Sequence, residues 1–177
     1  MTLQLKDMRL LRLHGHVDGK WVDADSNARF AVTNPADGSR IAEVPEMGAA
    51  ETRRAIEAAQ RALPGWRAKP AKERAAVLRR WYDLVMANAD DLALLMTTEQ
   101  GKPLAEARGE VAYGASFIEW FAEEGKRVYG DTIPQHAPDK RIIAIGKFHG
   151  VIAAATPTGC LKTRMRLSGP CEGMTSP

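Results

Sequence analysis

Residues 99–134 read EQGKPLAEARGEVAYGASFIEWFAEEGKRVYGDTIP and contain the strongest secondary-structure signals of the chain. Gly101 is expected to be the left-handed cap of a preceding helix, and Pro103 prevents that helix from continuing. A long helix is predicted from Leu104 to Val128. Its inward stripe consists of apolar residues at helical spacing, widened by two aromatic ones: Val111, Ala115, Ile118 and Ala122, with Phe117 and Phe121.

Two further helical segments are predicted upstream. Residues 55–63 repeat apolar side chains at helical spacing, and Pro64-Gly65 is expected to stop that helix. A second helix is predicted to begin near Ala71 and to bury four residues at positions i, i+4, i+7 and i+8: Val77, Trp81, Leu84 and Val85. Its apolar face continues through Leu92, Leu95 and Met96, with a break or short turn expected at residues 88–90.

The first fifty residues favour short strands and turns. Asp18-Gly19 favours a tight hairpin turn, because both residues can adopt positive φ. A second hairpin is predicted to join residues 30–33 to residues 40–44 through the sequence NPADG, where Pro35 fixes φ. The hairpins and helices together predict an α+β fold.

Further strands are expected near the C-terminal end. Residues 141–148 are predicted to be extended. The apolar run GVIAAA, residues 150–155, is typical of a strand covered on both faces, as in a parallel sheet. The segment that follows has little periodicity and few apolar residues, so no partner strand is predicted there.

Composition excludes several classes of protein. The chain has 177 residues with 45% hydrophobic and 27% charged residues, and its net charge is +3, which is an ordinary globular mixture. Basic and acidic residues alternate, so nucleic acid is not an expected partner. No purely apolar run is longer than residues 151–155, which is far shorter than a membrane span requires. We expect a cytoplasmic protein without a secretory signal or a membrane partner.

Cysteine and histidine do not form a recognisable metal or nucleophile motif. Cys160 and Cys171 lack CxxC spacing and a partner histidine. His14 and His16 would share one face of a strand and could pair on a metal. Because no further ligand lies nearby in the sequence, a solvent-facing strand edge is the favoured interpretation, and no metal site is predicted.

The predicted helices offer two other groups with a chemical alternative. Glu119, Glu123 and Glu124 could be general bases, but acids spaced along an amphipathic helix usually face water. The pair Trp120-Phe121, together with Trp81-Tyr82, could form a stacking surface, although aromatic residues at helical spacing more often lie in the core. No glycine-rich phosphate-binding motif occurs. These residues alone therefore predict no active site.

A family resemblance adds what this reasoning lacks. EQGKPLAEA at residues 99–107 and FIEWFAEEGKRVYGDTIP at residues 117–134 resemble the aldehyde dehydrogenase superfamily. Within it, they are similar to succinate-semialdehyde dehydrogenases. GKWV at residues 19–22 and NPADG at residues 34–38 match the family's opening hairpins. The agreement extends from about residue 12 to Pro157.

The resemblance implies a domain organisation and an activity. Residues 1–157 would be the N-terminal part of an aldehyde dehydrogenase domain: β-hairpins, three long helices, then the first strands of an α/β nucleotide-binding and bridging region. The activity would be oxidation of succinate semialdehyde to succinate with NAD(P). Thr156 and Pro157 would line the nucleotide cleft at the end of a strand. Residues 158–177 depart from the family and are expected to form an unrelated, disordered tail.

The same resemblance implies that catalytic groups are missing. The family's cysteine nucleophile and glutamate base have no counterpart in this sequence, since neither Cys160 nor Cys171 lies in a Gly-Gln-x-Cys context. The chain is therefore expected to be truncated and inactive alone, with no catalytic residue. As an alternative, residues 139–148 resemble the family's β-structure that bridges subunits. The chain would then be a non-catalytic fragment that pairs with an intact aldehyde dehydrogenase subunit.

Overall fold

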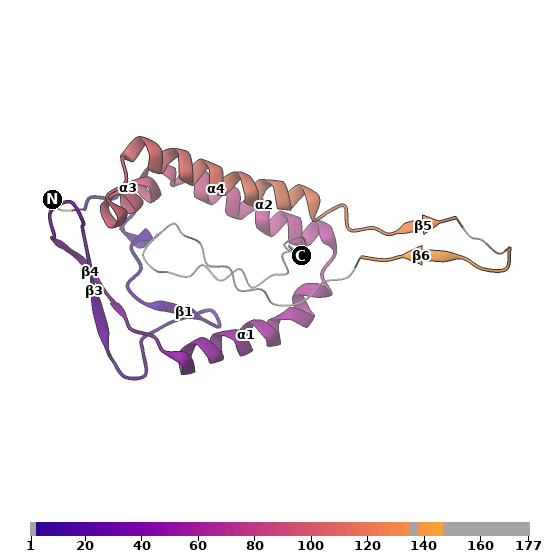
Figure 1. The fold of residues 1–177 in the computed structure, drawn as a ribbon, viewed down its shortest axis with the longest axis horizontal. Helices are drawn as coiled ribbons and strands as arrows, with labels where there is room; N and C mark the ends of the chain where they lie inside the picture. The colour runs from indigo at the N-terminus through magenta and orange to yellow at the C-terminus, as the bar shows by residue number, and fades with distance from the viewer. Residues whose placement is uncertain (1–2, 135–137, 147–177) are drawn as a thin grey trace.

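A computed structural model describes residues 3–134 and 138–146 of the chain (Figure 1). It is a mixed α/β structure in which three antiparallel strand pairs accompany the helices. The elements, in chain order, are η1 (Met8–Leu10), β1 (Gly15–Val17), β2 (Lys20–Val22), β3 (Arg29–Thr33), β4 (Arg40–Pro45), α1 (Ala49–Arg67), α2 (Ala71–Ala87), α3 (Ala89–Gln100), α4 (Leu104–Glu124), β5 (Asp131–Ile133) and β6 (Ile142–Ala144). The predicted α+β class is confirmed.

Both predicted N-terminal hairpins are present. In the β1–β2 pair, Val17 is opposite Lys20, and the turn residues Asp18 and Gly19 have φ values of 52° and 76°. Positive φ at both positions is what the mirror-image hairpin turn requires. The β3–β4 pair closes through residues 34–39, where Gly38 also has positive φ. Local backbone sterics therefore fix both turns.

One hydrophobic cluster lies between β4 and α3. Its buried members are Ala42, Val44 and Leu95, and Leu95 is only 1% exposed. Partly buried side chains pack around them, several from the N-terminal segment: Leu3, Leu5, Leu10, Leu11, Leu13, Phe30, Val32 and Ile41. The cluster joins the β3–β4 hairpin to the helices through burial of apolar surface.

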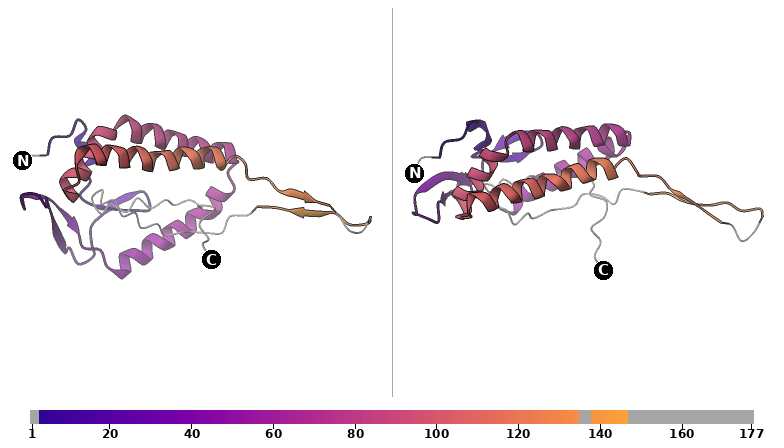
Figure 2. Two further views of the ribbon diagram at one scale, coloured as in Figure 1. Left: turned by 45° about the horizontal axis from the view of Figure 1, so that its top comes forward. Right: turned by 90° about the horizontal axis from the view of Figure 1, so that it is seen from above.

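The helices α2, α3 and α4 pack against one another, and α4 lies alongside α2 over most of its length (Figures 1 and 2). A second cluster between α3 and α4 contains Ala93, Met96, Ala107 and Val111. The predicted break falls at Asn88, whose backbone leaves the helical region and whose side-chain amide donates to the Leu84 carbonyl at 2.8 Å. Gly101 then caps α3 with φ 73°, as predicted.

Two predicted helix ends are wrong. The helix α1 continues through Pro64 and ends at Arg67. A proline removes one backbone donor, but its carbonyl still accepts, here from the Ala68 amide at 3.0 Å, so the exposed last turn continues beyond Pro64. The helix α4 ends at Glu124, four residues before the predicted Val128. Tighter turns follow it, in which the Lys126 and Arg127 amides donate to carbonyls three residues earlier.

The predicted buried face of α2 is partly wrong. Val77 and Leu84 are 42% and 58% exposed, whereas Trp81 and Val85 are half-buried. Ala75 is the buried residue of this helix. The face that meets α4 is therefore centred on a small residue, and the large apolar residues at 77 and 84 lie to one side of it. The apolar spacing correctly predicted a helix, but it did not identify which side of the helix is buried.

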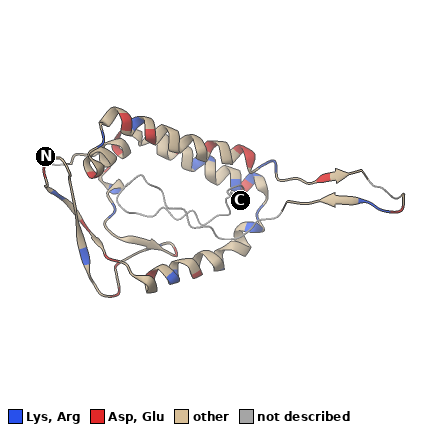
Figure 3. Ribbon diagram, in the orientation of Figure 1, with Lys and Arg blue, Asp and Glu red and all other residues tan. Residues whose placement is uncertain are grey.

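Charges of both signs are interspersed along the helices (Figure 3). Some of them join neighbouring helices: Arg79 of α2 donates to Glu119 of α4 at 2.9 Å, and Arg108 of α4 donates to Asp90 of α3 at 3.1 Å. The charged residues on these faces therefore pair with one another. Among the described helices, none combines the length and apolarity that crossing a bilayer requires.

Candidate functional site

The most distinctive described surface is the β5–β6 hairpin, which extends away from the helices as a two-stranded arm (Figures 1 and 2). Its strands are antiparallel, with Asp131 opposite Ala144 and Ile133 opposite Ile142. The strand β6 lies inside the extended segment predicted at residues 141–148, of which residues 147 and 148 are outside the described chain. Its partner β5 was not predicted.

The arm is exposed and apolar at the same time. Ile133, Ile143 and Ile145 are 44%, 62% and 72% exposed. At its base the two strands approach so closely that a Cβ at Gly130 would overlap the Ala144 carbonyl oxygen. Within residues 3–134 and 138–146, neither outer edge of this two-stranded ribbon pairs with another strand. Such an edge, together with exposed isoleucines, is a surface that another chain can cover by strand pairing or by apolar contact.

The helix α4 has a second apolar face that points away from α2 and α3. Val111, Ala115 and Ala122 are buried against those helices, as predicted. The large aromatic residues occupy other positions and are 37–66% exposed: Tyr113, Phe117, Trp120 and Phe121. The prediction that Phe117 and Phe121 widen the inward stripe is therefore wrong, and so is the assignment of Trp120-Phe121 to the core. The spacing of residues 113, 117 and 120 was a signal for a second face.

The three glutamates near the end of α4 are engaged in ion pairs. Glu119 accepts from Arg79. Glu123 pairs with Lys126, whose hydrogen bond lowers the pKa of the Glu123 carboxyl. Glu124 accepts from Arg127 at 2.6 Å. A general base at neutral pH benefits from a raised pKa, and the shift at Glu123 has the opposite direction. The interpretation that these acids face water rather than act as bases stays a prediction.

The two N-terminal histidines share an exposed face of the first hairpin. The ring of His16 contacts that of Trp21 edge-on, with centroids 5.0 Å apart, and His14 Nε2 is 3.7 Å from the Asp23 carboxylate. The guanidinium of Arg29 also donates a hydrogen bond to the Asp23 carboxylate. Within residues 3–134 and 138–146, no three His, Cys, Asp or Glu side chains are grouped to hold a metal ion.

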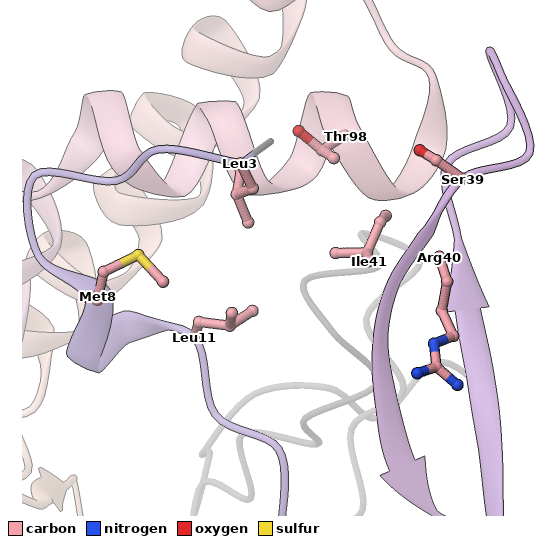
Figure 4. A pocket seen from close by; sticks show the side chains of 7 residues that line it. All are labelled: Leu3, Met8, Leu11, Ser39, Arg40, Ile41 and Thr98. Atoms are coloured by element: carbon pink, nitrogen blue, oxygen red, sulfur yellow. The ribbon is translucent and has the colours of Figure 1, made fainter. Parts of the chain in front are cut away.

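The hollows on the described surface include two that lie between secondary-structure elements. The first, of about 390 Å³, lies between the N-terminal segment, β4 and α3 (Figure 4). Its lining combines apolar side chains with two hydroxyl groups and one guanidinium: Leu3, Met8, Leu11, Ser39, Arg40, Ile41 and Thr98. The second, of about 230 Å³, lies between α2 and the end of α4, where Lys72, Arg79 and Lys126 surround small alanines. Neither hollow contains an assembled catalytic group.

The residues that the resemblance assigns to a cofactor are outside the described chain. This holds for Thr156 and Pro157, for the apolar run at residues 150–155 and for both cysteines, Cys160 and Cys171.

Comparison with known proteins identifies a family. The sequence model of the aldehyde dehydrogenase family matches residues 21–157. Glutarate-semialdehyde dehydrogenase of Pseudomonas putida is 65% identical over 155 residues, covering 88% of this chain and 32% of that protein. Succinate-semialdehyde dehydrogenase [NADP(+)] of Escherichia coli is 60% identical with the same coverage.

Solved structures give the same result. The crystal structure of succinate-semialdehyde dehydrogenase from Burkholderia pseudomallei is similar with a TM-score of 0.76 and 66% identity, over 78% of this chain and 29% of that one. The chain thus spans about a third of the length of the curated relatives that it matches.

Proposed function

The chain belongs to the aldehyde dehydrogenase family, and from this premise we propose that residues 1–157 are the N-terminal part of an NAD(P)-dependent succinate-semialdehyde dehydrogenase. The observation that carries the proposal is identity of 60–65% over 155 residues to dehydrogenases whose names specify succinate or glutarate semialdehyde. Both compounds are short aldehydes with a terminal carboxylate. The proposed substrate is therefore an aldehyde of this class, with succinate semialdehyde as the first choice.

The proposed reaction converts an aldehyde, water and NAD(P)⁺ into a carboxylic acid, NAD(P)H and a proton. By the covalent route that the family resemblance implies, this reaction needs a thiolate to attack the aldehyde, donors for the oxyanion, a hydride acceptor and a base that activates water against the thioester. The described residues include no cysteine, and no Gly-Gln-x-Cys sequence occurs anywhere in the chain. We therefore propose that the 177-residue chain alone does not oxidise aldehydes.

A chimera tests the family role of these residues. Residues 1–157 would replace the matching N-terminal third of the Escherichia coli relative, and NADPH formation from succinate semialdehyde would be followed at 340 nm. The chimera should keep activity within about tenfold of the parent, because the replaced part has 60% identity. A chimera that folds by circular dichroism but is inactive would contradict the role. The 177-residue chain, assayed in parallel, should give no NADPH above background.

A second function is supported by the exposed arm. We propose that the β5–β6 hairpin pairs with an intact aldehyde dehydrogenase subunit, since Ile143 and Ile145 are largely exposed and no other described strand pairs with either outer edge. Burial of these side chains against a partner would contribute favourable apolar transfer free energy.

Co-elution with the Escherichia coli relative on size exclusion tests this arm. Ile143→Lys should abolish co-elution, whereas Leu84→Lys is the matched control, because Leu84 is similarly exposed, at 58% against 62%, but lies on α2. If the wild-type chain does not co-elute, or if both variants lose binding equally, the arm is not the contact surface.

A further inference from the structure

The N-terminal segment at residues 3–11, called the strap below, lies across α3 and the β3–β4 hairpin. It carries four leucines that pack on the cluster formed by Ala42, Val44 and Leu95: Leu3, Leu5, Leu10 and Leu11. The strap contains one short 3-10 turn, η1, and no strand. Its backbone-to-backbone hydrogen bonds are local, from the Leu10 and Leu11 amides to carbonyls three residues earlier.

A buried carboxylate connects the strap to α3. Asp91 is 5% exposed, and its two oxygens accept from the backbone amides of Lys6 at 3.1 Å and Asp7 at 2.8 Å. These bonds join residues 84 and 85 positions apart. Because the acceptor is a carboxylate, each bond is stronger than one between neutral groups.

The preceding residue contacts the strap in a different way. Asp90 accepts from the Lys6 ammonium at 3.4 Å and from Arg108 of α4 at 3.1 Å. Both of its ion-pair partners are exposed side chains, and exposed ion pairs contribute little to the free energy of unfolding. Among the described hydrogen bonds, Asp91 accepts from the strap backbone and Asp90 accepts from a strap side chain. Substitution of Asp90 is therefore the control for substitution of Asp91.

The strap is incompletely packed against the body. The hollow of about 390 Å³ separates Leu3, Met8 and Leu11 of the strap from Ile41 and Thr98 (Figure 4). Met8 is 54% exposed. Segments with few ladder hydrogen bonds and low contact density are those that open locally below the free energy of global unfolding.

We propose that residues 3–11 open as a unit, independently of the remaining fold, and that the Asp91 carboxylate is the tie that holds them closed. Opening breaks the two hydrogen bonds to Asp91 and exposes the leucines and the hollow. It leaves the β3–β4 ladder and the packing of α2 on α4 in place, because the side-chain hydrogen bonds described for residues 3–11 reach only the strap itself and α3.

Hydrogen–deuterium exchange of the full 177-residue chain, read by mass spectrometry, tests the proposal. In the wild type, peptides from residues 3–11 should exchange faster than peptides from β3 and β4, with little dependence on low urea concentrations. Asp91→Asn replaces one acceptor by a donor that faces a backbone amide, so strap exchange should accelerate about tenfold or more. Asp90→Asn should change it by less than about threefold.

Each outcome decides the proposal. Strap exchange that accelerates in Asp91→Asn alone, with β3 and β4 unchanged, supports it. Equal effects of both substitutions would reject Asp91 as the tie. If the wild-type strap exchanges as slowly as β3 and β4 and with the same urea dependence, the strap opens only by global unfolding and the proposal is wrong. This last comparison needs no variant.

Discussion

Leu95→Ala should be among the most destabilising single truncations of the described core. Leu95 is 1% exposed and is the largest fully buried side chain described in the structure. It lies between α3 and the β3–β4 hairpin, where Ala42 and Val44 are its buried neighbours. The substitution removes about three carbons, which corresponds to about 2.4 kcal/mol of transfer free energy at 0.8 kcal/mol for each.

The cavity left behind adds to that loss, but the neighbouring hollow allows the N-terminal segment to relax into the space. Leu→Ala changes in well-packed cores cost about 2.7–5.0 kcal/mol, and relaxation places Leu95→Ala near the lower end, at about 3 kcal/mol. Urea unfolding at low micromolar protein concentration, followed by circular dichroism at 222 nm, measures this change in the free energy of unfolding.

Leu84→Ala is the matched control for Leu95→Ala. It makes the same chemical change in a helix, but Leu84 is 58% exposed, so its free energy of unfolding should change by no more than about 0.5 kcal/mol. Since both substitutions alter helix propensity alike, the difference between them reports burial. Equal losses for the two variants would refute the assignment of Leu95 to the core.

Three further predictions follow from the backbone and the charges. Gly101→Ala should destabilise the chain by about 1–2 kcal/mol in urea, because Gly101 has φ 73° and a Cβ there would lie 2.9 Å from Pro35 Cγ. Gly109→Ala should instead stabilise it by about 0.5–1 kcal/mol, since this helical glycine has open space around it; a loss there would contradict the description of α4. Arg54 donates two hydrogen bonds of 2.7 Å to Asp25 and lowers the pKa of that carboxyl below 3.8. The stabilisation from this pair is therefore complete above the pKa of Asp25 in the unfolded chain, and it is lost as the pH falls through the lower pKa of the folded state. Asp25→Asn should therefore make the free energy of unfolding fall less steeply with decreasing pH in the acid range. An unchanged slope there would refute the contribution of the pair.

Features that depend on neighbouring residues were predictable from the sequence. The turn at Asp18-Gly19 and the cap at Gly101 require positive φ, and both were found where the sequence placed them. The break at Asn88 was also found. In each case the deciding interaction is a steric or hydrogen-bonding constraint within a few residues of the chain.

Features that depend on packing between distant parts of the chain were not predictable from the sequence. Phe117 and Phe121 were assigned to the buried stripe, yet both are substantially exposed, because α4 meets α2 and α3 through the positions of Val111 and Ala115. Apolar character alone does not distinguish two apolar faces of one helix. Pro64 was expected to end α1, but one lost donor in an exposed last turn is tolerated.

The candidate site divides in the same way. The family was predictable, because long matching motifs specify it, and the comparison over residues 21–157 confirms it. The assignments of Thr156 and Pro157 stay predictions, since these residues lie outside the described chain. The exposed face of the arm was not predictable, because β5 pairs with β6 across eight or more intervening residues.

By itself, the sequence determined the two N-terminal turns, the cap at Gly101, the order of the N-terminal hairpins and helices, and the family, because local sterics and long motifs specify these without reference to a distant contact. Only the tertiary structure decided which helix faces are buried, that Asp91 binds the backbone of Lys6 and Asp7, and that the isoleucines of β5 and β6 remain exposed. These depend on which surfaces meet in space, and apolar burial is non-directional, so residues 85 positions apart are brought together by the packing of the whole chain.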